Sequence, residues 1–275
     1  MKNLKLAAVC LSCLTMTGCS ALNFSVEGLI NAPKLTSEQS EIHQALIESV
    51  GSNITLKYPK NGEYRSAYVI ANIDDEPTDE AMVFYEYTSN GSEEDGLRVN
   101  ILDKDEKGKW YSVKELAGAG TDIDQVIISP MGSNNQTDVF VGYQNLTNDE
   151  KTMEIYSYTD GDFKRVALDT YSVLEPLDIN NDGYIELITI QRSTNNDTGA
   201  VTAKASMLNM KNNEITRGEN VDMCDNVTSY VSSKTGMLDS GRRAIFIDGL
   251  TADGKLQTEI IYYRYSGLQN PMQLI

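Results

Sequence analysis

Short runs of β-branched and aromatic residues dominate the chain from Ile54 onward, and clusters of Gly, Asn, Asp and Ser separate them. Runs of this length between turn-forming residues predict an all-β domain built of hairpins. The clearest expected strands are residues 66–72, 81–87, 97–102, 125–129, 139–143, 153–158, 185–191, 200–207, 243–248 and 258–265. After Ile54, residues 112–118 are the one segment whose pattern would also fit a helix.

One short helix is expected before the strands, within residues 35–52. Apolar residues recur there at helical spacing, at Ile42, Leu46 and Val50. Thr36 is the expected N-cap, and Gln39, three residues later, is its capping-box partner. Gly51 is the expected stop.

A unit of strand, acidic loop and strand recurs at intervals of about 50 residues. Its copies are residues 67–87, 125–144, 173–193 and 229–249. The copy at 125–144 keeps only Asp138 of the acids, and the last copy keeps only the outline. A second hairpin follows each copy. Each unit would then contain four strands, as a propeller blade does.

We therefore expect residues 53–275 to form a β-propeller-like array of about four to five four-stranded blades. A five-bladed ring would require residues 53–60 to contribute to another blade. Truncation of a longer parent is the other interpretation, because no strand after 258–265 is available to return to the first blade.

One acidic loop has the residues of a calcium site. Calcium takes six to eight oxygen ligands at about 2.3–2.6 Å. The expected ligands are the side chains of Asp178, Asn180, Asp182 and Glu186 and the carbonyl of Tyr184, and Gly183 permits the turn. A weaker copy comprises Asn72, Asp74, Glu76 and Glu80, with Pro77 in place of the glycine. An EF-hand does not fit, because its twelfth position is Thr189. The alternative is an acidic turn that only copies the shape.

The acidic units resemble the FG-GAP and VCBS repeats of integrin-type propellers, whose loop reads D-x-[DN]-x-D-G-x-x-[DE]. Residues 35–275 are also similar to uncharacterised propeller-type lipoproteins of Gram-positive anaerobes. The phrases ITLKYPKNGEYRSAYVI, GAGTDID and IFIDG carry this similarity. The resemblance implies a fold and a cellular address, but no activity.

The N-terminus reads as an export signal. Lys2 and Lys5 precede an apolar run, Leu6 to Met16, that is too short to span a membrane. The sequence Met16-Thr17-Gly18-Cys19 resembles a bacterial lipobox, so we expect a lipoprotein signal peptide over residues 1–18 and a tether over 19–34. The resemblance implies acylation of Cys19 (palmitate) and anchoring in the lipid bilayer, on the extracytoplasmic face of a bacterial cell membrane. An ordinary signal peptide with a chance cysteine is the alternative.

Composition limits the chemistry. The chain has 23 Lys and Arg against 40 Asp and Glu, a formal charge of −17, which argues against nucleic acid as a partner. The single histidine, His43, excludes mechanisms and zinc sites that need two, and we expect it at the surface or half-buried. After signal removal and acylation Cys224 is the one cysteine left, so no intrachain disulfide can form.

These features predict a lipid-anchored surface lipoprotein whose calcium-stabilised propeller binds an unknown surface protein or glycan. The alternatives are a carboxylate-dependent carbohydrate-active enzyme, either a glycosidase or a lyase, and an accessory solute-binding or envelope-assembly lipoprotein. We expect the strand tyrosines to pack between blades rather than to form a platform for sugars.

Overall fold

The structure is a computed structural model that describes residues 35–88, 96–130, 137–145, 150–194, 197, 200–211, 214–218, 220–225 and 227–271. The chain divides into two compact units, Met1–Ser40 and Glu41–Ile275. The expected signal peptide (1–18), Cys19 and the tether (19–34) lie outside the described residues.

Helix α3 (Ser37–Val50) begins and ends where the sequence predicts. The Thr36 hydroxyl accepts the Gln39 N–H at 3.1 Å, and the Gln39 side-chain oxygen accepts the Thr36 N–H at 3.1 Å. This reciprocal pair is a capping box. Gly51 follows the helix with a φ of 85°, a left-handed conformation that glycine adopts readily.

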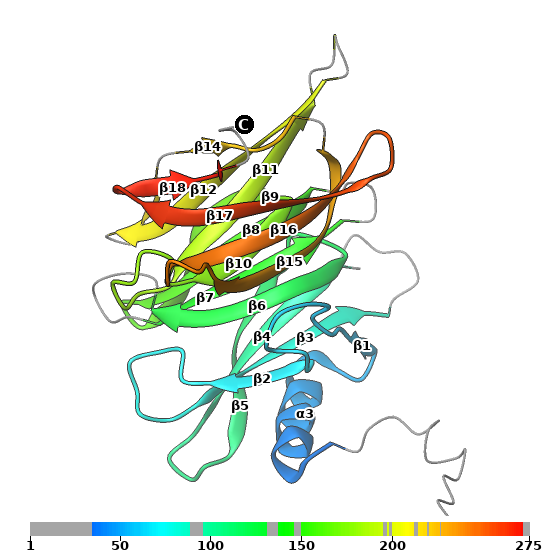
Figure 1. Cartoon of the computed structure of the whole chain (residues 1–275). Helices are drawn as coiled ribbons and strands as arrows, with labels where there is room; N and C mark the ends of the chain where they lie inside the picture. The colour runs from blue at the N-terminus through cyan, green and yellow to red at the C-terminus, as the bar shows by residue number, and fades with distance from the viewer. Residues whose placement is uncertain are drawn as a thin grey trace, which may run out of the picture. The chain divides into compact units, whose positions relative to one another are not determined.

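The strands form four antiparallel sheets, each built from strands that are consecutive in sequence (Figure 1). Sheet A contains β1 (Ile54–Leu56), β2 (Tyr68–Ala71), β3 (Glu80–Tyr87), β4 (Leu97–Lys104) and β5 (Trp110–Ala117). Sheet B contains β6 (Asp122–Pro130), β7 (Thr137–Gln144), β8 (Lys151–Thr159) and β9 (Asp162–Tyr171). Sheet C contains β10 (Val173–Leu177), β11 (Glu186–Thr194), β12 (Val201–Lys211), β13 (Glu214–Arg217) and β14 (Val221–Asp222). Sheet D contains β15 (Val227–Met237), β16 (Arg243–Thr251), β17 (Leu256–Arg264) and β18 (Gly267–Gln269).

All ten strands expected from the clearest runs correspond to strands, and the all-β class is confirmed. Residues 112–118 are not helical: β5 alternates between more and less exposed residues with a period of two, as a strand with one solvated face does. The five-bladed alternative, in which residues 53–60 contribute to another blade, is not supported by the pairing of Ile54–Leu56. Strand β1 pairs with β3, so it lies in the same sheet as β2.

Strand β3 of sheet A, β7 of sheet B and β11 of sheet C are buried on both faces over most of their length. In β3, Val83 and Tyr85 pack with the helix, whereas Met82 and Phe84 pack in the cluster shared with sheet B. Because successive strand residues point to opposite faces, an apolar run without alternation marks a strand between two layers.

Buried clusters join the sheets in chain order. One cluster contains residues of sheets A and B, a second joins B to C, and a third joins C to D. A fourth cluster places Ile42, Ala45 and Leu46 of α3 against sheet A. Among the described residues, no buried cluster joins sheet D to sheet A.

Candidate functional site

The predicted calcium loop folds into one turn that connects β10 to β11. Asn181 and Gly183 have φ values of 63° and 97°. Gly183 therefore adopts the left-handed backbone conformation that the predicted sharp turn requires. The Asp178 carboxylate accepts the backbone N–H groups of Asp182 at 3.0 Å and Gly183 at 3.2 Å. Asp182 in turn accepts the N–H of Tyr184 at 2.9 Å. The structure therefore brings the predicted residues together.

Glu186 closes this loop from the first position of β11. It is 3 % exposed, and one oxygen accepts the Ile179 N–H at 3.1 Å. Burial raises the pKa of Glu186 to about 7, and the carboxylates of Asp182 and Asp178 contribute in the same direction.

The donor atoms of this loop converge, but they already have partners. The Asn180 amide nitrogen is 2.9 Å from an oxygen of Asp182 and 2.9 Å from an oxygen of Glu186. Arg243 of β16 lies 2.8 Å from the Asp178 carboxylate and supplies a positive charge. Within the described ranges, no three His, Cys, Asp or Glu side chains are grouped so that they could hold a metal ion. The donor set is oxygen-rich, as calcium requires, but its side chains would have to rearrange.

The weaker copy has a similar frame between β2 and β3. Glu80 accepts the Ile73 N–H at 2.8 Å, and burial raises its pKa to about 7. Its other oxygen is buried and has no hydrogen-bond partner among the described residues. Asp74 accepts the Glu76 N–H at 2.7 Å, whereas Asn72 donates its amide to backbone carbonyls. Glu80 and Glu186 thus close their loops in the same way, each seven residues after the amide that it accepts.

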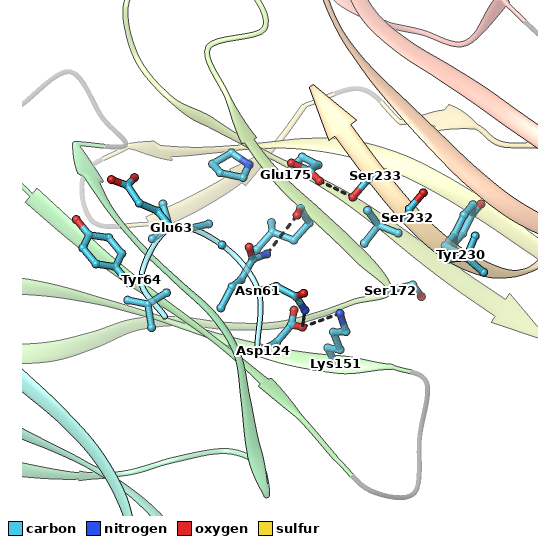
Figure 2. A pocket seen from close by; sticks show the side chains of 18 of the residues that line it. Asn61, Glu63, Tyr64, Asp124, Lys151, Ser172, Glu175, Tyr230, Ser232 and Ser233 are labelled. Carbon is cyan, nitrogen blue, oxygen red and sulfur yellow. Dashed lines mark hydrogen bonds and ion pairs between the residues drawn. The ribbon is translucent and has the colours of Figure 1, made fainter. Parts of the chain in front are cut away.

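A polar cavity of about 520 Å³ lies where the first strands of sheets B, C and D meet (Figure 2). Residues 61–64 and Lys151 complete its wall. Figure 2 shows Glu63 and Tyr64 on one side and Tyr230, Ser232 and Ser233 on the other. Its size is that of a small-molecule site. None of the predicted site residues lines it.

Two of the wall strands carry β-bulges at the cavity. The register of β6 shifts between Ile123 and Gln125, so Asp124 is an extra residue in that strand. The register of β15 shifts between Tyr230 and Ser232, around Val231. Both extra residues line the cavity. Bulges redirect side chains and are frequent next to functional sites.

Asp124 is the centre of a buried polar network. Its carboxylate is 2 % exposed and accepts hydrogen bonds from Tyr171 at 2.6 Å, Lys151 at 2.8 Å and Asn61 at 2.8 Å. Burial, followed by the Asp124 charge, raises the pKa of Tyr171 well above its usual value, so this hydroxyl stays a donor. Gly142 leaves room for the tyrosine, because a Cβ there would lie 2.1 Å from the Tyr171 hydroxyl.

Glu175 is the other carboxylate held in the wall. The Ser233 hydroxyl of β15 donates a hydrogen bond to it, which links sheets C and D. Burial raises the pKa of Glu175, and the serine bond opposes that shift. Glu63 is exposed at the rim. Among the described lining residues, Lys151 is the one basic side chain beside these three acids.

Sequence reasoning missed this cavity because its walls come from distant segments. The available signal was a pair of acids, Asp122 and Asp124, just before an apolar run. Three strand tyrosines, Tyr85, Tyr143 and Tyr171, are fully buried, as expected for packing, whereas Tyr64 and Tyr230 line the cavity.

The surroundings of His43 and Cys224 do not indicate a catalytic or metal-binding role. His43 is half-buried, with its Nδ1 2.8 Å from the Tyr68 hydroxyl. Cys224 is half-buried, and burial, together with Glu259, raises its thiol pKa to about 11, which keeps it protonated and unreactive. No helix in the described part of the chain has the length and apolarity needed to cross a membrane.

Comparison with protein-family models gave no match, and no curated protein matched the chain. Among solved structures, a hypothetical protein from Leishmania major aligns with 82% of this chain and 74% of its own, at 12% identity and a TM-score of 0.33. A glycoside hydrolase aligns with 86% of this chain and 82% of its own, at 10% identity and a TM-score of 0.33. Neither likeness bears on the function of this chain.

Proposed function

We propose that this protein is an extracytoplasmic, lipid-anchored binding module whose four sheets act as the blades of a β-propeller-like array. Its ligand site is the cavity between β6, β10 and β15. The bulges at Asp124 and Val231 carry this proposal, because two strands from different sheets depart from regular pairing at the same cavity. The lipid anchor rests on the lipobox-like sequence that ends at Cys19.

The ligand is expected to be hydrophilic. The wall presents hydroxyl, amide and carboxylate groups from Ser172, Ser232, Asn61 and Glu175. Polar groups at defined positions in a concave site fix the orientation of a ligand. A screen of soluble glycans and envelope proteins against the purified full chain will identify it.

Glu175→Gln is expected to weaken binding of that ligand about tenfold or more, because a hydrogen bond to a charged group is worth about 1.5–3 kcal/mol. Isothermal titration calorimetry measures the change. Glu106→Gln, at an exposed position in the β4–β5 turn, is the control and should bind like the wild type. Equal affinity of all three proteins would place the ligand elsewhere.

A carbohydrate-active enzyme remains the second candidate, and the raised pKa of Glu175 favours it. Burial in a cavity that raises the pKa of a carboxyl group is the environment typical of a general acid. Asp124 is held by three donors, so Glu63 is the free carboxylate left for the second role. Release of reducing sugar from a polysaccharide panel, lost in Glu175→Gln, would favour this candidate over simple binding.

We also propose a structural calcium ion in the loop from Asp178 to Glu186. Asp178, Asn180, Asp182 and Glu186 would hold it with the Tyr184 carbonyl. Calcium there would neutralise carboxylates that repel one another. The oxygen-rich, convergent donor set supports this proposal, and the loop from Asn72 to Glu80 is its weaker counterpart.

Calcium at a hundred times its dissociation constant is expected to raise the melting temperature by about 5 °C relative to chelator. Asp182→Ala should abolish the rise, whereas Asp239→Ala, in an exposed turn, should keep it. Differential scanning calorimetry in both conditions decides the matter. Identical melting temperatures in calcium and chelator would refute the ion.

A further inference from the structure

We infer that the cavity takes a glycan that carries a protonated amine, and that the amine sits at Glu175. This inference rests on the proposed binding function and names the class of ligand. Its basis is the charge of the wall, the partners of each carboxylate, and the state of the strand edges that face the cavity.

The wall has an excess of negative charge. Glu63, Asp124 and Glu175 are its acids, and Lys151 is its one base among the described lining residues. The Lys151 ammonium is already bound to Asp124 at 2.8 Å. A concave site lined with one sign of charge concentrates ions of the other sign, and the whole chain, at −17, adds to this field. The cavity therefore repels anionic ligands and attracts cationic ones.

Glu175 is the acid best placed to hold the cation. Its hydrogen-bond partner is the Ser233 hydroxyl, and no Lys or Arg of the described residues pairs with it. A half-buried carboxylate without a counter-ion is costly, because desolvation disfavours its charged form. An ammonium group from the ligand would remove that cost. Figure 2 shows Glu175 facing the cavity beside Ser233.

The strand edges argue for a sugar rather than a peptide strand. A peptide that added to these sheets would need free backbone groups along one edge. The Gln125 amide instead occupies the Leu174 carbonyl at 3.2 Å, on β10. On β6, the backbone N–H groups of Lys60 and Asn61 occupy the Ile123 and Asp124 carbonyls. The Ser172 hydroxyl can donate to or accept from a sugar hydroxyl, whereas the Ser232 hydroxyl, which donates to Asp248 at 2.8 Å, can only accept.

The test is an array of glycans in which each amino sugar is paired with its N-acetylated form, probed with the full chain. We expect the amine forms to bind at least tenfold tighter than their acetylated partners. Glu175→Gln should remove that preference, and Glu106→Gln should keep it. The second variant is Glu63→Gln. Because Glu63 is exposed, this substitution should leave the fold intact, and it should weaken the preference for the amine forms.

Other results separate the inference from the function. Equal or tighter binding of the acetylated forms, still sensitive to Glu175→Gln, would overturn the amine and leave the binding function standing. If no glycan binds, both the amine inference and the proposal that the cavity binds a glycan are overturned. Binding of a lysine-rich peptide alone, measured in parallel, would overturn the glycan and identify a cationic protein segment as the ligand.

Discussion

Replacing Asp124 by alanine is expected to lower the free energy of unfolding by about 3 kcal/mol. The carboxylate is 2 % exposed and has three donors, so its removal leaves the Tyr171 hydroxyl and the Lys151 ammonium without their acceptor. Breaking one side of a buried charged network costs more than the network contributes, because the remaining groups stay desolvated. Chemical denaturation followed by circular dichroism gives the value.

Two variants control this result. Asp124→Asn keeps an oxygen acceptor of the same shape and should cost less than the alanine. Asp239→Ala, in an exposed turn, should change stability by less than about 0.5 kcal/mol. A loss below 1 kcal/mol in Asp124→Ala would mean that the network does not hold the cavity together.

The stability of the protein is expected to fall as the pH rises from about 4.5 to 7.5, in the absence of calcium. Burial raises the pKa of Glu80 and of Glu186 from 4.5 to about 7, so in this window the folded state binds more protons than the unfolded state. Stability contributed by these protons is complete below the unfolded pKa and is lost as the pH passes the folded one. The loss is up to about 3 kcal/mol per carboxyl, at 1.36 kcal/mol per pKa unit.

Glutamine variants test the assignment. Glu80→Gln and Glu186→Gln keep an oxygen to accept the Ile73 and Ile179 N–H groups, but they cannot ionise. Each should flatten the pH dependence measured by urea denaturation, and the double variant should remove most of it. Glu106→Gln, exposed in the β4–β5 turn, should reproduce the wild-type slope. A wild-type slope in the double variant would show that other groups take up the protons.

The cavity proposed as the ligand site and the stability of the fold both depend on the Asp124 network. The carboxylate fixes Lys151 and Tyr171, and these hold one wall of the cavity in place. Variants of Asp124 should therefore lose affinity through the shape of the site. Variants of Glu175 should lose affinity with little change in stability, which distinguishes a positioning residue from a binding one.

The sequence alone determined the local structure. It predicted the capping residues Thr36 and Gln39, the ten strand runs and the turn at Gly183. These features depend on hydrogen bonds and dihedral preferences of residues that are neighbours in sequence. The repeat also predicted that Glu80 and Glu186 occupy equivalent positions, and their shared bond to a backbone amide confirms it.

Only the tertiary structure decided the cavity and the partners of the acids. Arg243 lies 65 residues from Asp178, and Tyr171 lies 47 residues from Asp124, so no periodicity could reveal either pair. The bulge at Asp124 is a mismatch between two strands, and it exists only once they pair. Local propensity depends on neighbours in sequence, whereas a wall made of three sheets depends on how those sheets pack.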